Sequence, residues 1–238
     1  MKISAPFRSK TLSPTDFKTV LFRLGRVVDA MAGEHAGFGR SEWCLQGDSL
    51  EQARLYPAFD GTDPSCAALA VLKEQFRNSQ DQTYVAIWIG NETMAAGVSM
   101  VCHLGMPGVL NSFAIDMRGE HGLDDFEAIA GVVIRTVQEF EPAYVEVSPA
   151  KYYARRVFDD RPGLGWMFYL SGIVTMQQVP EARALIPVHA AGKQQTGTII
   201  VSVADTAFSI DNPEHIEIAN RIEIRLVDQD LLPRYVDL

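Results

Sequence analysis

The densest group of side chains that could do chemistry lies between residues 116 and 127. Its members are Asp116, Glu120, His121, Asp124, Asp125 and Glu127. Carboxylates at such short spacing could bind a divalent cation or present an acidic surface to a basic partner. They could also form a solvated loop in which Asp124 and Asp125 cap the helix that follows. The metal interpretation is the least favoured, because the spacing matches no EF-hand loop and a lone imidazole is a soft ligand for Ca²⁺ or Mg²⁺.

The residues that most often act as nucleophiles or zinc ligands are scattered. The three cysteines, Cys44, Cys66 and Cys102, form no CxxC pair, and no two of the five histidines sit at the spacing that places ligands on one helical face. We expect all three thiols to be reduced and mostly buried, with Cys102 inert inside an apolar strand. Phosphate-binding, nucleophile-elbow and zinc-protease motifs are missing as well. The sequence thus predicts no catalytic site, no metal and no cofactor.

The overall charge points to a class of partner. The chain of 238 residues has 21 Lys and Arg against 30 Asp and Glu, a formal net charge of -9. This sign disfavours nucleic acid, whose phosphates attract basic surfaces. It suits a basic protein, because complementary potentials speed encounter. The segment KYYARR (151–156) could stack on single-stranded bases, but the charge favours a turn with its tyrosines against the core and its arginines outside.

Charge is also uneven along the chain. Residues 1–40 hold seven bases and three acids (+4), whereas residues 201–238 hold three bases and eight acids (-5). Such asymmetry is typical of elements that attract each other in the fold, or of an acidic recognition surface. The acidic C-terminal helix, with Glu214 and Glu217, is therefore a second candidate surface after the 116–127 loop.

The elements that must position these groups follow from apolar spacing. Three-and-four periodicity predicts helices that begin at the Ser13 cap and end near Gly33, and that cover 64–79 and 124–141. The last segment is ambiguous, but Asp211 followed by Pro213 and Glu214 favours a helix start. Strands are predicted at 41–47, 83–90, 95–104, 109–117 and 143–149, in the run GLGWMFYLS (163–171), and near 185–191 and 196–204.

The order of these elements predicts one α+β domain over residues 1–238, with an antiparallel or mixed sheet and several packed helices. The run GLGWMFYLS is interpreted as a buried strand, with Trp166 and Phe168 on one face and Met167 and Tyr169 on the other. The N-terminus lacks the apolar stretch of a secretory signal, and no segment is apolar for long enough to span a membrane, so we expect a cytoplasmic protein without a membrane partner.

The segment VFDDRPGLGWMFYL (157–170) resembles the signature of an immunity-protein family from bacterial polymorphic toxin systems, the family numbered fifty-two, which includes type VI secretion immunity proteins. The resemblance is carried by an aspartate and an arginine shortly before Gly-Trp-Met, a strand like TGTIIVSVAD, and a late helix that ends in Asp228-Gln229-Asp230-Leu231-Leu232-Pro233. It covers chiefly residues 143–238.

This resemblance implies an α+β protein that binds and neutralises a cognate toxin, usually one with a restriction-endonuclease-like nuclease domain, by stoichiometric protein binding. It assigns no catalytic role to any position. The candidate toxin-binding residues are Asp116, Glu120, Asp124, Asp125, Glu127, Glu214 and Glu217. The rival hypotheses are a small hydrolase with a site assembled from dispersed residues, and a secretion adaptor that binds the same effector without inhibiting it.

Overall fold

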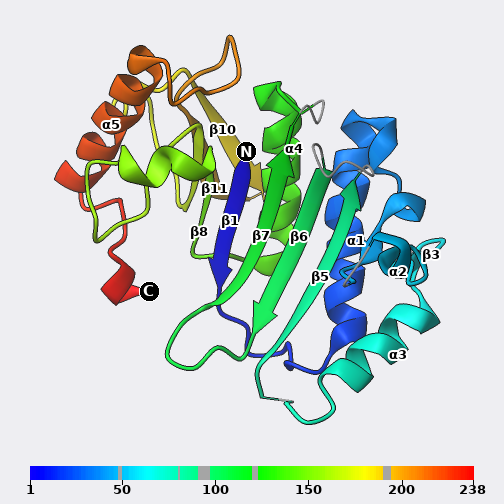
Figure 1. Ribbon diagram of the computed structural model, residues 1–238. Coiled ribbons are helices and arrows are strands. Elements are labelled where there is room, and N and C mark those ends of the chain that lie inside the picture. The colour runs from blue at the N-terminus through cyan, green and yellow to red at the C-terminus, as the bar shows by residue number, and fades with distance from the viewer. Residues whose placement is uncertain (48–49, 80, 91–96, 120–122, 190–193) are drawn as a thin grey trace.

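A nine-stranded antiparallel sheet organises the molecule, in the order β10-β11-β9-β8-β1-β7-β6-β5-β2 (Figure 1). The computed structural model describes residues 1–47, 50–79, 81–90, 97–119, 123–189 and 194–238. The strands of this sheet are β1 (Lys2–Phe7), β2 (Cys44–Leu45), β5 (Thr83–Gly90), β6 (Gly97–Leu104), β7 (Asn111–Arg118), β8 (Tyr144–Ser148), β9 (Met167–Ser171), β10 (Ala184–His189) and β11 (Gln195–Val201). The α+β prediction is confirmed.

The four predicted helices form where apolar residues recur on one side, and the described residues contain a fifth, short helix that was not predicted. They are α1 (Phe17–Glu34), α2 (Leu50–Arg54), α3 (Cys66–Gln75), α4 (Phe126–Phe140) and α5 (Pro213–Asp228), with 3-10 turns η1 (Ala36–Phe38), η2 (Arg40–Glu42), η3 (Ala150–Ala154) and η4 (Tyr235–Asp237). A small hairpin joins β3 (Phe59–Asp60) to β4 (Asp63–Pro64). Among the helices of the described residues, none is long and apolar enough to cross a membrane.

Two predicted helix starts were wrong by a few residues. Ser13 does not cap α1. Its carbonyl closes a turn by accepting from Asp16 N at 3.0 Å, and the Asp16 carboxylate caps the helix by accepting from Thr19 N at 3.1 Å. Likewise Asn212, rather than Asp211, caps α5. In both cases the residue next to the first helical turn has the shorter reach to its free N–H groups.

The core of the first half lies between the sheet and two helices. Figure 1 shows α1 and α4 together behind β1, β7, β6 and β5, and α5 at the other end of the sheet. Buried residues alternate with more exposed ones along β1, β6 and β7, as in β6, where Met100 and Cys102 are fully covered. Phe113 of β7 stacks on Phe140 of α4, with ring centroids 4.5 Å apart. The buried side of these strands and the apolar side of α1 and α4 therefore face the same core.

β1 was not predicted as a strand, yet it lies in the middle of the sheet. It pairs with β7 over all six of its residues and with β8 over Lys2 to Ser4. Its apolar residues Ile3 and Phe7 are fully buried. The first half of the chain and the signature-bearing second half are thus joined through residues that lie at the start of the sequence.

Candidate functional site

The predicted acidic loop lies at the end of β7 and the start of α4. Asp116 is half-buried on β7, where its Oδ1 is 3.3 Å from Nε of Arg118. Asp124, Asp125 and Glu127 are exposed. The Asp125 carboxylate caps α4 by accepting from Ala128 N at 3.1 Å, which confirms its capping role. Glu120 and His121 lie outside the described residues.

Basic groups offset part of this acidic charge. Lys2 is the register partner of Asp116 across β1 and β7. The Met1 amino group donates to the Met117 carbonyl at 2.7 Å; burial lowers its pKa, and the nearby Asp116 and Asp124 charges act in the opposite direction. The end of β7 is consequently a mixed-charge border, with Asp124 and Glu127 exposed beside it.

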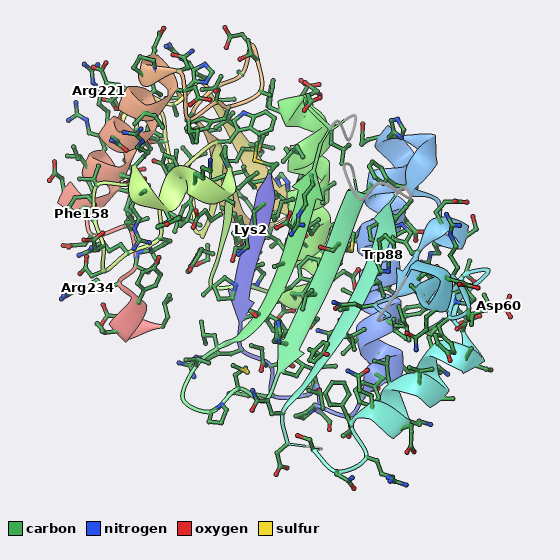
Figure 2. The ribbon with its side chains drawn as sticks, viewed as in Figure 1. Lys2, Asp60, Trp88, Phe158, Arg221 and Arg234 are labelled. Carbon is green, nitrogen blue, oxygen red and sulfur yellow. The ribbon has the colours of Figure 1, made fainter. Side chains whose placement is uncertain are left out.

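The second predicted surface, on α5, also carries both signs. Glu214 and Glu217 are exposed. Glu217 forms an i,i+4 ion pair with Arg221, and Glu214 Oε1 lies 4.0 Å from a guanidinium nitrogen of Arg183. Figure 2 shows Arg221 on the outer side of this helix, far along the sheet from the β5 end. Exposed pairs of this kind contribute little energy, so both carboxylates stay available to a partner.

The third carboxylate of α5, Glu223, points inward and was not singled out from the sequence. It is 1 % exposed and accepts three hydrogen bonds: from Tyr152 Oη at 2.7 Å, Val157 N at 2.8 Å and Leu164 N at 2.8 Å. Burial raises the pKa of Glu223, and these three donors oppose that shift. One side chain of α5 therefore holds both ends of the 157–164 loop against η3.

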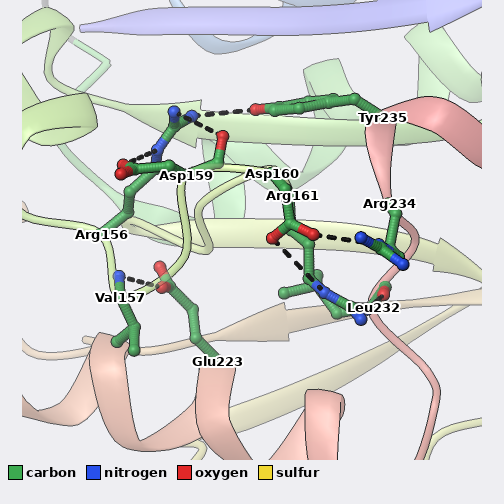
Figure 3. Close-up of polar contacts among 9 residues, drawn as sticks. All are labelled: Arg156, Val157, Asp159, Asp160, Arg161, Glu223, Leu232, Arg234 and Tyr235. Carbon is green, nitrogen blue, oxygen red and sulfur yellow. Dashed lines mark hydrogen bonds and ion pairs between the residues drawn. The ribbon is translucent and has the colours of Figure 1, made fainter.

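The segment that follows α5 is fixed to the same loop (Figure 3). Asp160 accepts from Tyr235 N at 3.0 Å through its carbonyl, and from Arg234 Nε at 3.0 Å through its carboxylate. Arg161 donates to the carbonyl of Leu232, and Arg156 donates to Tyr235 Oη at 2.9 Å. The Asp-Arg of the signature and the late Leu-Leu-Pro thus bind each other, which gives these two distant motifs a structural role.

The Gly-Trp pair lies beside these contacts. We call Glu223, the 157–164 loop, the segment after α5 and this pair the structural centre. Gly165 has φ +57°, and a Cβ there would lie 2.5 Å from Ser148 Cβ, so only glycine fits. Trp166 is 1 % exposed and donates through Nε1 to the Val203 carbonyl at 2.8 Å. The prediction that GLGWMFYLS contains a buried strand is confirmed, with β9 beginning at Met167.

Two expectations about single residues were wrong. Cys66 is exposed, because it opens α3 on the solvent side, whereas Cys102 is buried and its pKa rises to about 12. In KYYARR only Tyr152 packs inward; Tyr153 is 67 % exposed, because successive positions of η3 face different directions. In the part of the chain that the structure describes, no group of three or more His, Cys, Asp or Glu side chains is arranged to hold a metal ion.

A solved structure has a fold similar to that of this chain. The Pseudomonas aeruginosa T6SS protein PA0821 is similar, with a TM-score of 0.52 over 98% of this chain and 76% of that chain, at 11% sequence identity. No curated protein sequence matches the chain. The sequence pattern of the family Immunity protein 52 matches residues 22–234. The chain therefore belongs to the Immunity protein 52 family, as the resemblance predicted.

Proposed function

We propose that the protein is an immunity protein that binds and neutralises a cognate secreted toxin, a nuclease effector of a type VI secretion system, in the cytoplasm of the producing cell. The observation that carries this proposal is the family match over residues 22–234. The action is stoichiometric protein binding, without catalysis or a cofactor. The acidic charge of the chain supports a partner with a basic surface, as a nuclease cleft must have to hold phosphate.

Co-expression with the product of the neighbouring gene tests this function. An immunity protein rescues growth from a toxic neighbour and elutes with it as a stable complex on a sizing column. A complex without rescue would instead support the adaptor hypothesis. If neither a complex nor rescue is observed, the hydrolase hypothesis would be favoured.

The acidic loop is the first surface to test for toxin encounter. Asp124→Lys reverses one exposed charge and leaves the Asp125 cap in place, so its effect on α4 is small. We expect a slower association rate at low salt, and a smaller difference at high salt, because long-range attraction is screened. Glu214→Lys and Glu217→Lys test the α5 surface in the same way.

A matched control separates local from overall charge. Asp60→Lys makes the same change in net charge at an exposed position of the β3 hairpin, which Figure 2 shows far from Lys2 and from Arg221. Equal association rates for Asp124→Lys and Asp60→Lys would remove the 116–127 loop from the encounter surface.

A further inference from the structure

The face of β1, β7, β6 and β5 that points away from α1 and α4 has an unusual composition. The strand register places Ser4, Ala114, Val101 and Ala86 in one row across the four strands. The same register places Pro6, Ser112, His103 and Tyr84 in the adjacent row. We call these two rows the open face.

The open face carries no Asp, Glu, Lys or Arg in either row, although most of its residues are half-exposed. Ser4, Val101 and Ala114 are all partly accessible, and Tyr84 is 37 % exposed. In an antiparallel sheet with one face in water, residues along each strand usually alternate between apolar ones on the core side and polar ones on the outer side. Depletion of charge together with aromatic residues is instead typical of the centre of a protein interface. The small side chains also allow close approach of another surface.

A pocket lies at the β5 border of the open face. Its volume is about 280 Å³, and Tyr84 and Ala86 of β5 line it together with Leu45, Tyr56 and Gln75. Gln75 of α3 donates to Tyr84 Oη at 3.0 Å, which fixes the phenol at the rim. Burial of one large partner side chain in a pocket beside a flat, uncharged surface is the usual arrangement of an interface anchor.

Charged residues border the open face on two sides: Glu146 of β8 is the register partner of Ser4 in the first row, and a charged row lies at one end of the strands. The row beside Ser4, on the side away from Pro6, contains Lys2, Asp116, Ser99 and Trp88. Figure 2 shows Lys2 and Trp88 on the two outer strands of the four. The charges of Asp116 and Asp124 both act to raise the pKa of the Met1 amino group, against the effect of its burial. At this mixed-charge end the exposed Asp124 suits Lys or Arg of a partner, while a second copy of a chain with a net charge of -9 is repelled.

We propose that the open face is the surface on which the toxin docks, with an uncharged part of the toxin over the two rows and basic toxin side chains against Asp116 and Asp124. This inference rests on the proposed function. It gives the acidic loop the role of a charged border rather than of the whole interface.

Ala114→Arg tests the proposal, because it places a long charged side chain at the centre of the open face. Ala30→Arg is the matched control, since Ala30 is also a half-buried alanine but lies on α1, which packs against the other face of the sheet. We expect the toxin Kd to rise by at least about 100-fold for Ala114→Arg, since an unpaired charge in a desolvated interface costs several kcal/mol, and to change less than about threefold for Ala30→Arg.

Two further measurements distinguish a variant that does not fold from a folded variant that does not bind. Thermal unfolding shows whether Ala114→Arg is folded, and Ser4→Arg, in the same row on β1, provides a second variant if it is not. Wild-type protein that neither binds nor protects would refute the proposed function itself. Wild-type protein that binds the toxin, with Ala114→Arg and Ser4→Arg binding equally well, would overturn the docking surface alone. A wild-type dimer that either variant converts to a monomer would assign the face to self-association and would also overturn it.

Discussion

Removing the Glu223 carboxylate should be among the most destabilising changes on α5, although it is a charged residue on an amphipathic helix. In Glu223→Ala the amide groups of Val157 and Leu164 lose their acceptor inside the protein. The Tyr152 hydroxyl has an alternative in Asn220 Oδ1, at 3.3 Å. One buried donor, Leu164 N, and one part-buried donor, Val157 N, are therefore left without this partner.

The magnitude follows from these two donors. An unsatisfied buried donor costs about 1–3 kcal/mol, and the sum is reduced because Val157 N is only part-buried and because the variant no longer has to bury a carboxylate. We expect the free energy of unfolding to fall by about 2–4 kcal/mol at pH 7, from the balance of these terms. For a domain of this size this corresponds to a drop in Tm of roughly 4–16 °C.

Urea unfolding followed by tryptophan fluorescence measures this loss, because Trp166 lies in the structural centre that Glu223 holds. Glu217→Ala is the control: it removes a carboxylate from the same helix, but one that is exposed and forms an exposed ion pair with Arg221, so it should cost less than about 0.5 kcal/mol. Equal losses for the two variants would refute the assignment of Glu223 as the acceptor that fixes the loop.

The pH dependence of this site has a defined sign. Burial raises the pKa of both Glu223 and Glu146 above the ordinary glutamate value. A carboxyl group with a raised pKa in the folded state contributes stability that is full below its unfolded pKa of about 4.3 and is lost as pH rises through the folded value. Glu223→Gln should therefore cost more stability at pH 5 than at pH 7.5, in parallel urea titrations. A cost that is larger at pH 7.5 would contradict the raised pKa.

Three other changes test separate parts of the structure. Trp166→Ala should lower the free energy of unfolding by about 3–5 kcal/mol in a denaturant titration, and loss of toxin binding with unchanged stability would place the indole in an interface instead. Cys66 should react with a thiol reagent in the folded protein while Cys102 reacts only after unfolding; because Cys44 is partly accessible, a folded variant with both Cys44→Ser and Cys66→Ser that still reacts quickly would contradict this. Asp16→Ala should cost about 1 kcal/mol in thermal unfolding and Ser13→Ala clearly less, and the reverse order would contradict the observed cap.

The helices could be predicted because their signal is local. In α4 the apolar residues recur at helical spacing and Asp125 stands directly before the first turn. β1 could not be found in the same way, although Ile3, Ala5 and Phe7 alternate. Pro6 argues against an interior strand because it lacks an N–H group, and the strand is established only by partners more than 100 residues away.

The structural centre was predicted only in part, for the same reason. GLGWMFYLS shows its burial through aromatic composition, but nothing near Glu223 indicates that this carboxylate points inward. Its backbone partners Val157 and Leu164 lie 66 and 59 residues away in sequence. The open face was missed as well, because Ser4, Ala114 and Val101 are unremarkable until the register places them in one row.

Stability and recognition use different residues in this arrangement. The polar groups of the signature, such as Arg161 and the carbonyl of Asp160, are bonded within the chain itself, so contacts with a partner would have to compete with contacts that hold the fold. Ser4 and Ala114 lie on the open side of strands whose other side forms the core. Substitutions there can change partner affinity by altering shape and charge at the surface while the core and the Glu223 contacts stay intact. If the toxin docks on the open face, variants selected for a new toxin should therefore change these rows and retain Glu223, Gly165 and Trp166.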